Sequence, residues 1–338
     1  MSGKQLVAVG AGHAHLHLAR HAGALARRGI ALTLIDPGRF WYSGLATGML
    51  SGQYTTHQDK IDPQPLVEPV GRFIRGRVTA IDLTQRHVVL DDGRRMPFDR
   101  LSFNVGSEVA THQMDGVEHA WKVKPIQNLA RLHDELEHRL KRDHPLRVAV
   151  VGAGATGCEV ATNLLGLARR LSANLQLQVF SSTQRLMPEA PAGAARFMAR
   201  TLVQGGALLE LHTRIVAVQP DHLRDEAGRT WPSDLTVLAT GLNPPTWLHS
   251  LALPLGERGG LRVGPTLQSP ADPHVFGAGD CIDFAPRALP RLGVFGVRQA
   301  PVLLHNLIAS FEALALHAYR PQRRWRRGGG GMPTGVCA

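Results

Sequence analysis

The hydrophobic pattern of the first three dozen residues predicts a strand, a helix and a second strand. Residues 5–9 form a short apolar run typical of a buried parallel strand, and a glycine-containing turn follows them. Apolar side chains then recur at helical spacing over 14–28, and a second apolar run at 31–35 ends at Asp36. Two apolar strands joined by a helix indicate a βαβ unit of a parallel sheet.

The same pattern returns in the middle of the chain. A strand at 146–151, a glycine-rich turn, a helix at 159–171 and a strand at 175–180 repeat the opening order. Later side chains repeat at identical spacing: Gly93, Arg94, Pro97, Asp99 and Gly106 in the first copy, and Gly228, Arg229, Pro232, Asp234 and Gly241 in the second. Two copies in one register indicate an internal duplication.

Shorter patterns predict the remaining elements. They are antiparallel strands at 71–78 and 79–90 with a turn at 91–93, a strand at 101–106 that returns to the main sheet, a linking helix at 125–143, strands at 261–263 and 274–276, and a helix at 298–315. Together the elements predict an α/β protein with two Rossmann-like, three-layer dinucleotide-binding domains, each with an inserted β-meander.

The glycine loops carry the chemistry of these domains. In the first loop, Gly10 permits a tight turn, and Gly12 lets a pyrophosphate approach the backbone at the positive end of the helix. Asp36 is placed to accept hydrogen bonds from a ribose, whereas the third glycine position is occupied by His15. The second loop is a complete GxGxxG, formed by Gly152, Gly154 and Gly157.

Composition narrows the class of protein. The 338 residues have room for two domains, and 43% hydrophobic with 19% charged residues indicates a globular chain. The net charge of +11 is spread along the chain, which favours an anionic small molecule or membrane surface over nucleic acid. The three cysteines, the absence of a signal-peptide pattern and the lack of a long apolar run lead us to expect a cytoplasmic protein.

Several motifs carry a family resemblance. In order, the opening loop, NVG at 104–106, ATG at 239–241 and FGAGD at 276–280 resemble the FAD-dependent pyridine nucleotide–disulfide oxidoreductase superfamily over nearly the whole chain. The GHAH of the first loop and the segment 42–54 resemble its type II NADH dehydrogenase-like branch, which includes the flavoprotein domain fused to selenide–water dikinase. A histidine at position 15 is usual in that branch, and VKP at 123–125 and the run 293–300 are also similar to it.

The resemblance implies two cofactors, FAD in the first copy and NADH or NADPH in the second. The implied domains are 1–124 with 243–320 for FAD, so that this domain is discontinuous, 125–242 for NAD(P)H, and a basic glycine-rich tail at 321–338. The implied cofactor contacts are Gly10, Gly12, His13, His15, Asp36, Tyr42, Ser43, Val78, Gly106, Gly279, Asp280, Val297 and Gln299 for FAD, and Gly152, Gly154, Gly157, Ser181, Arg185 and Gly241 for NAD(P)H.

Two departures from the family pattern matter. Disulfide reductases of the superfamily carry a CxxxxC pair near residues 40–55, and the absence of cysteine there excludes a dithiol relay. Relatives usually continue into a third domain for dimerisation or membrane docking, and we expect most of it to be missing here, which leaves the oligomer open. The arginine-rich tail is either a frayed end or a peripheral contact with an anionic membrane.

Hydride transfer from a nicotinamide to a flavin needs stacking and orientation rather than an acid–base pair. Glu159 matches a family glutamate near the nicotinamide, with a solvated helix position as the alternative, and Lys124 would place a cation near the flavin, with a surface role as the alternative. The end of the second strand of the second copy has no acid but has Ser181 and Arg185, which favours NADPH or no preference.

The remaining reactive side chains predict no further site. His13, His15 and His17 are close in sequence, but FAD accounts for the loop and a further ligand is not evident, so we expect no metal. Cys158 and Cys281 adjoin cofactor motifs and are expected to be buried, inert thiols.

The expected function is that of an FAD-dependent NAD(P)H oxidoreductase with a non-disulfide electron acceptor, a quinone as first choice. One alternative is a sulfide- or selenium-handling flavoprotein. The other is a redox sensor or partner subunit that binds the cofactors without turnover.

Overall fold

The chain folds into two compact units in the computed structural model, which describes residues 3–111, 114–142 and 144–322. The first unit is drawn from 1–40, 60–107 and 243–338, and the second from 41–59 and 108–242. The arginine-rich tail beyond residue 322 lies outside the described residues.

The boundaries of these units differ from the predicted cofactor domains at two places. The prediction put 41–59 and 108–124 with the first domain, whereas their contacts place both with the second unit. The reason for the first is packing, because Ala46, Met49 and Leu50 are buried in the hydrophobic core of the second unit. Which dinucleotide each unit binds stays a prediction.

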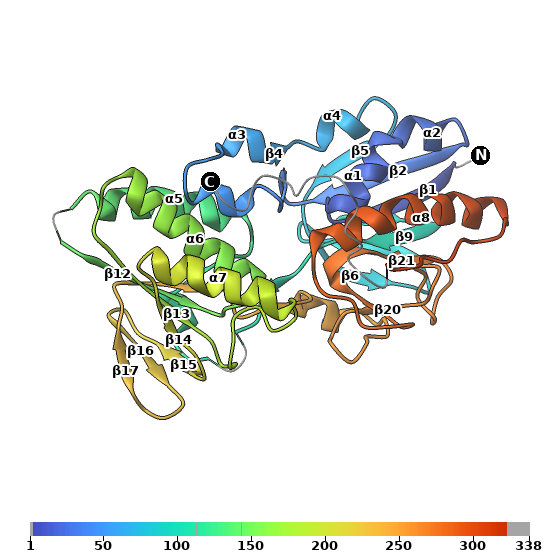
Figure 1. Cartoon of the computed structure of the whole chain (residues 1–338). Coiled ribbons are helices and arrows are strands. Elements are labelled where there is room, and N and C mark those ends of the chain that lie inside the picture. The colour runs from blue at the N-terminus through green and yellow to red at the C-terminus, as the bar shows by residue number, and fades with distance from the viewer. Residues whose placement is uncertain (1–2, 112–113, 143, 323–338) are drawn as a thin grey trace. The chain divides into compact units, whose positions relative to one another are not determined.

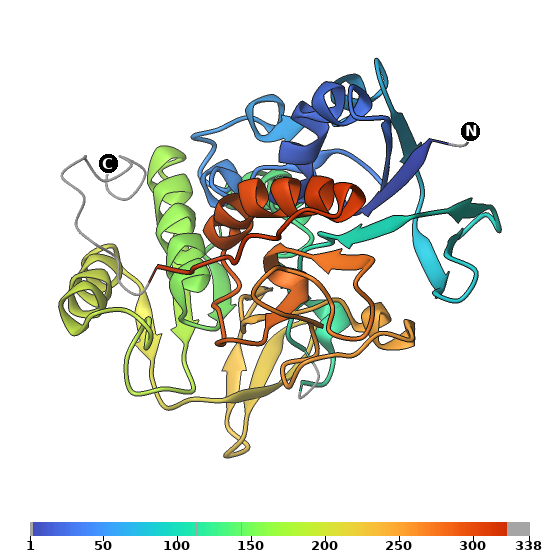
Figure 2. The ribbon, with the colours of Figure 1, turned by 90° about the vertical axis from the view of Figure 1, so that its right-hand side faces the viewer.

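The first unit is built on a parallel five-stranded sheet of order β21-β9-β1-β2-β5 (Figure 1). Its strands are β1 (Lys4–Val9), β2 (Ile30–Asp36), β5 (Arg72–Arg75), β9 (Arg100–Phe103) and β21 (Val275–Gly277). Helices α1 (His13–Arg20) and α8 (Gly293–Glu312) pack against each other, as Figure 2 shows. The unit also contains α2 (Ala22–Ala26), α4 (Gln64–Val67), the parallel pair β20 (Leu261–Val263) and β22 (Ile282–Phe284), and the meander β6 (Val78–Asp82), β7 (His87–Leu90) and β8 (Arg95–Pro97).

The second unit repeats this plan with the sheet order β11-β18-β12-β13-β14, again parallel. Its strands are β11 (Trp121–Lys122), β12 (Leu146–Val151), β13 (Leu175–Phe180), β14 (Leu208–Glu210) and β18 (Leu235–Leu238), and its helices are α3 (Thr56–Asp59), α5 (Gln127–Leu140), α6 (Ala155–Arg170) and α7 (Ala192–Gln204). The meander is β15 (Ile215–Val218), β16 (His222–Asp225) and β17 (Thr230–Pro232). Four short strands lie where the chain passes from one unit to the other: β3 (Phe40–Trp41), β4 (Lys60–Ile61), β10 (Glu108–Val109) and β19 (Leu242–Asn243).

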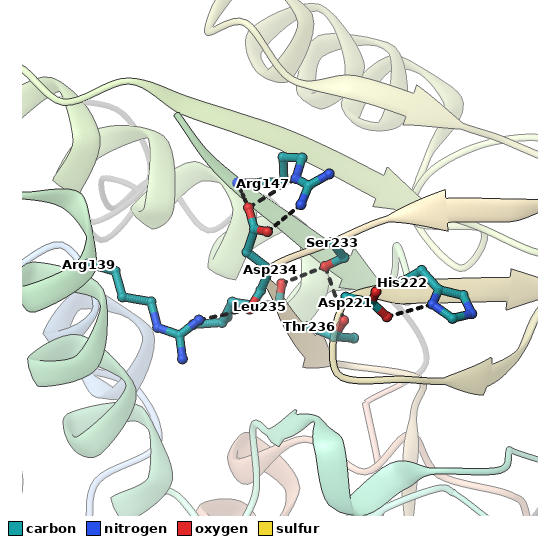
Figure 3. A network of polar contacts seen from close by, with 8 residues as sticks. All are labelled: Arg139, Arg147, Asp221, His222, Ser233, Asp234, Leu235 and Thr236. Atoms are coloured by element: carbon teal, nitrogen blue, oxygen red, sulfur yellow. Dashed lines mark hydrogen bonds and ion pairs between the residues drawn. The ribbon is translucent and has the colours of Figure 1, made fainter. Parts of the chain in front are cut away.

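The duplicated aspartates Asp99 and Asp234 form equivalent hydrogen bonds in the two units. Asp99 accepts a hydrogen bond from the backbone N–H of Gln5 at 2.7 Å, and Asp234 accepts one from the backbone N–H of Arg147 at 2.9 Å. The Asp234 carboxylate also accepts from the Arg147 guanidinium, and Figure 3 shows the network around it. Each aspartate therefore holds the first strand of its unit beside the strand that follows the meander.

Five predicted elements need correction. The strand predicted over 79–90 is two strands, β6 and β7, because a turn at 83–86 separates them. The helix predicted over 159–171 begins at Ala155, directly after the glycine loop. The helix predicted over 14–28 is interrupted at His21, whose Nδ1 hydrogen-bonds the carbonyl of His17. Residues 72–75 join the main sheet in parallel with β2 and are not part of the meander. The last helix runs from 293 to 312 instead of 298 to 315, because the glycines of its first turns concealed its start.

Candidate dinucleotide-binding sites

The first glycine loop lies between β1 and α1 and has no room for side chains. Gly10 has a φ of +87°, and a Cβ on it would lie 2.6 Å from the carbonyl oxygen of Asn104. A Cβ on Gly12 would overlap the Asn104 side chain. The first two predicted glycines are therefore required by the close approach of the loop to the end of β9.

Asn104 was not among the predicted site residues, yet it connects three parts of the loop. Its Oδ1 accepts from the N–H of Ala14 at 2.9 Å and of His15 at 3.3 Å, and its Nδ2 donates to the carbonyl of Ala278 at 2.6 Å. The residue is 3% exposed. The NVG motif at 104–106 is the sequence feature that could have pointed to Asn104. Only the fold shows that its side-chain amide fixes the first turn of α1.

His15 fills the third glycine position by pointing into the interior of the unit. Its ring is fully buried, with Nδ1 2.6 Å from the carbonyl oxygen of Gly10 and Nε2 2.8 Å from the hydroxyl of Ser102. Burial lowers the pKa of this imidazole to about 4, so it is neutral near pH 7. His15 therefore stabilises the loop from the interior of the unit, through the carbonyl of Gly10. A direct contact of His15 with FAD stays a prediction.

Asp36, at the end of β2, has the geometry of a ribose acceptor. Its Oδ2 accepts from the N–H of Ala11 at 2.7 Å and its Oδ1 from the N–H of Gly38 at 2.8 Å. A carboxylate has about four acceptor positions, so capacity remains for ribose hydroxyls. Burial raises the pKa of Asp36, while the two backbone hydrogen bonds and the charge of Arg77 lower it.

The GAGD turn and the start of α8 provide a second group of polar atoms in the first unit. The Gln299 Oε1 accepts from the N–H of Gly279 at 2.7 Å, and the fully buried Nε2 of Gln299 has no hydrogen-bond partner among the described residues. Asp280 accepts from the Ser107 hydroxyl at 2.8 Å. Buried donors in native proteins almost always have a hydrogen-bond partner, so a donor without a protein partner indicates a bound polar group. These residues therefore fit FAD.

Other residues predicted near FAD have mixed positions. Val297 is half-exposed on α8, Val78 is 6% exposed in the core, and His13 packs edge-on against Phe40 with ring centroids 4.9 Å apart. Gly106, like its counterpart Gly241 in the second unit, has a positive φ with open space beside it. Their cofactor contacts stay predictions.

The second loop, between β12 and α6, is closed even more tightly. A Cβ on Gly152 would overlap the backbone of Ala239, and a Cβ on Gly157 would overlap the carbonyl of Gly152. Gly154 has open space around it, and α6 begins at Ala155 with no side-chain cap. The first-turn N–H groups of α6 are thus suited to a phosphate.

A cavity of about 180 Å³ lies beside this loop, within the second unit. Its lining comes from five places: residues 110, 111 and 114, the end of β12, the end of β13, the segment that leads into the meander, and the segment just after β18. The residues are Ala110, Thr111, Met114, Val151, Gly152, Phe180, Ser182, Thr213, Arg214, Ile215 and Thr240. A cavity at the carboxyl ends of parallel strands is the usual place for a nucleotide.

Of the two predicted residues at the end of β13, neither lines this cavity. The Ser181 hydroxyl lies 2.9 Å from that of Thr183, and the Arg185 Nη2 donates to the carbonyl of Pro188 at 2.6 Å. Sequence reasoning missed Arg214, which does line the cavity, because it is distant from the glycine loop in sequence.

Glu159, on α6, is the predicted catalytic residue with the clearest environment. Burial raises the pKa of its carboxyl, while a hydrogen bond from the Thr47 hydroxyl at 3.4 Å lowers it. Lys124 lies just before α5 and is partly buried. Tyr42, 42% exposed, and Ser43 belong to the second unit, so their predicted contact with FAD stays a prediction.

Both described cysteines are inert in this fold. Cys158 and Cys281 are fully buried, and burial raises the pKa of each thiol to about 12. Among the described residues there is no group of three or more His, Cys, Asp or Glu side chains placed to hold a metal. Within the same residues, no helix is both long and apolar enough to cross a bilayer.

The chain is similar to a known protein family and to several known relatives. The model of the family described as "Pyridine nucleotide-disulphide oxidoreductase" matches residues 4–303. The chain is 27% identical over 200 residues to the "Type II NADH:quinone oxidoreductase" of Haemophilus influenzae. The matched region covers 55% of this chain and 45% of that protein. It is 22% identical to the "NADH dehydrogenase-like protein YutJ" of Bacillus subtilis, covering 84% of the chain and 79% of that protein. The chain therefore spans about half the length of the Haemophilus relative.

Among solved structures, the sulfide:quinone oxidoreductase of Aquifex aeolicus has a TM-score of 0.78 to this chain. The sequence identity is 16%, with 92% of this chain and 77% of that one covered. At this identity the likeness concerns the fold alone, and it confirms the predicted α/β architecture.

Proposed function

Because the chain belongs to the pyridine nucleotide–disulphide oxidoreductase family, we propose that it oxidises NAD(P)H with FAD as its bound redox group and delivers the electrons to a quinone. The family and its type II NADH dehydrogenase-like branch are those predicted from the sequence, and FAD and NAD(P)H are the cofactors of this family. The observation that carries the proposal is the presence of two separate glycine-loop sites, one in each unit.

In this proposal the first unit binds FAD and the second binds NAD(P)H. Asp36 would hold the adenosine ribose of FAD, Asp280 its central region, and the orphaned Nε2 of Gln299 would donate to its ring system. When bound, FAD supplies the acceptor for the hydride of NAD(P)H and returns the electrons to the second substrate. Glu159 would orient the nicotinamide from α6, where its carboxylate accepts a hydrogen bond from the Thr47 hydroxyl.

The acceptor is proposed from chemistry and from the relatives. No cysteine lies between residues 40 and 55, and the buried thiols of Cys158 and Cys281 are protonated far above pH 7, so a disulfide acceptor has no relay. The Haemophilus relative is named for quinone reduction. The same two thiols count against a sulfide- or selenium-handling reaction, because a protonated thiol is a poor nucleophile.

The test is anaerobic reduction of the flavin-loaded protein followed by mixing with a soluble quinone. We expect NADH or NADPH to bleach the bound flavin and the quinone to restore its colour, with steady-state turnover. A protein that never retains FAD would refute the proposal. Bleaching without turnover on any quinone would favour a sensor, and bleaching by sulfide alone would favour the sulfur-handling alternative.

A variant separates the two sites. Gly154→Val puts a branched side chain in the second loop, where Gly154 has no neighbour within 4 Å that would disturb folding. We expect it to retain FAD and to be reduced by dithionite but not by NAD(P)H. Gly193→Val, at the equally open start of α7, is the matched control and should behave as wild type.

A further inference from the structure

The internal duplication allows one copy to be used as a control for the other at the adenosine end of the site. In the first copy the backbone N–H of Gly76 donates to the carbonyl of Asp36 at 3.2 Å, and in the second the N–H of Thr213 donates to the carbonyl of Ser181 at 2.8 Å. The residue that follows is an arginine in both copies, Arg77 and Arg214. The two arginines therefore occupy equivalent places at the carboxyl edges of their sheets.

Their surroundings differ by one carboxylate. The positive charge of Arg77 is one of the influences that lower the pKa of Asp36 against its burial. In the second copy the equivalent of Asp36 is Ser181, which has no charge. The carboxylate that interacts electrostatically with the arginine of the first copy thus has no counterpart at Ser181 in the second.

No other acid of the described residues replaces it effectively. Arg214 forms an ion pair with Glu226, but the Nε–Oε2 distance is 3.7 Å and both side chains are more than half exposed. Such solvent-exposed pairs are weak and are readily exchanged for a better anion.

Arg214 also stands where a ligand would reach it. It lines the cavity of about 180 Å³ beside the second loop together with the hydroxyl-bearing Ser182 and Thr213. A second hollow of about 220 Å³ shares Arg214; there Arg229 is already paired with Asp225, with an Nε–Oδ2 distance of 2.7 Å, so Arg214 is the guanidinium available to a ligand. A guanidinium with neighbouring hydroxyl groups is well suited to a phosphate dianion.

We propose that Arg214 binds the 2′-phosphate of NADPH and makes NADPH, rather than NADH, the preferred substrate. The inference rests on the proposed function, in which the second unit binds NAD(P)H. It differs from the sequence prediction in the residue responsible, because Arg185 turns to the carbonyl of Pro188 and lines neither cavity.

The experiment measures binding of 2′,5′-ADP and of 5′-AMP to the FAD-loaded protein by titration calorimetry. Wild type should bind 2′,5′-ADP at least about tenfold more tightly, since charge-assisted hydrogen bonds of this kind are worth about one power of ten or more in affinity. Arg214→Gln should bind the two ligands equally, with 5′-AMP unaffected. Arg224→Gln, which removes an exposed arginine from β16 of the same meander, is the matched control and should keep the preference.

A reciprocal variant tests the comparison between the copies. Ser181→Asp restores the missing carboxylate beside Arg214 and should reverse the preference toward 5′-AMP. The kinetic counterpart is a rise in KM for NADPH in Arg214→Gln with KM for NADH unchanged.

Three outcomes would overturn the inference. Equal binding of both ligands by wild type would reject it and leave the proposed function standing. Loss of the preference in Arg185→Gln but not in Arg214→Gln would transfer the role to Arg185. Failure of both ligands and both dinucleotides to bind would refute the proposed function of the second unit, and the assignment of Arg214 with it.

Discussion

Replacement of Asn104 by alanine removes the side chain that joins the end of β9 to the first turn of α1 and to the GAGD turn. Three hydrogen bonds are lost: those from the N–H groups of Ala14 and His15 to Oδ1, and that from Nδ2 to the carbonyl of Ala278. The three partner residues are fully buried, so water cannot replace the lost amide.

The magnitude follows from counting the unsatisfied groups. Two buried donors lose their partner, and each such loss costs about 1–3 kcal/mol. The carbonyl of Ala278 keeps the weaker hydrogen bond from the Cys281 thiol at 3.3 Å, so its loss costs less. The bond from His15 is long at 3.3 Å and contributes least. We therefore expect the free energy of unfolding of the cofactor-free protein to fall by about 4 kcal/mol, a large part of the stability of an ordinary domain.

The assay is urea unfolding followed by circular dichroism, combined with hydrogen exchange measured over residues 10–20. In Asn104→Ala the midpoint should fall and the start of α1 should exchange faster than the rest of the first unit. Asn163→Ala is the matched control. This half-buried asparagine on α6 donates to the carbonyl of Glu159 in a solvent-exposed hydrogen bond that water can replace, so the change should alter stability by less than about 0.5 kcal/mol. An Asn104→Ala protein within about 1 kcal/mol of wild type, with unchanged exchange at α1, would refute the argument.

Three further changes have defined outcomes. Gly157→Ala should destabilise the second unit and abolish NAD(P)H binding, because its Cβ would overlap the carbonyl of Gly152, whereas Gly154→Ala should fold normally by circular dichroism. Burial raises the pKa of Asp59 to about 6, so between about pH 4 and 6 the native state keeps a proton that the unfolded state releases. The free energy of unfolding therefore falls as the pH rises through this range. Asp59→Asn should remove this slope and be about 2–3 kcal/mol more stable than wild type above pH 6, and a less stable variant at pH 7 would contradict the argument. The pKa of Asp234 is lowered, chiefly by the hydrogen bond from the Arg147 side chain, so Asp234→Ala should lower the free energy of unfolding by about 1 kcal/mol at pH 7. In urea titrations the difference in stability between the variant and wild type should vanish as the pH falls below the pKa of the native aspartate. A difference that does not change with pH would exclude the ion pair as its cause.

The sequence by itself determined the duplicated plan and the family. Apolar runs, glycine loops and the repeated Gly, Pro and Asp positions are local signals, and the repeat made them mutually consistent. The strands at 146–151 and 175–180 were predicted with the bounds that the structure shows, because each is a short apolar-rich segment that ends at a turn. The breaks that local signals do not encode, such as the one at His21, were missed.

Only the tertiary structure decided which side chains meet. Asn104 and Ala14 are 90 residues apart in sequence, and Arg214 reaches the edge of the second sheet only because the chain returns there before the meander. Segment 41–59 belongs to the second unit because its apolar residues pack into that core, although it follows directly on the first βαβ unit. Periodicity specifies the face that a residue presents, whereas the partner it finds depends on how distant segments pack, and the details of both sites depend on that packing.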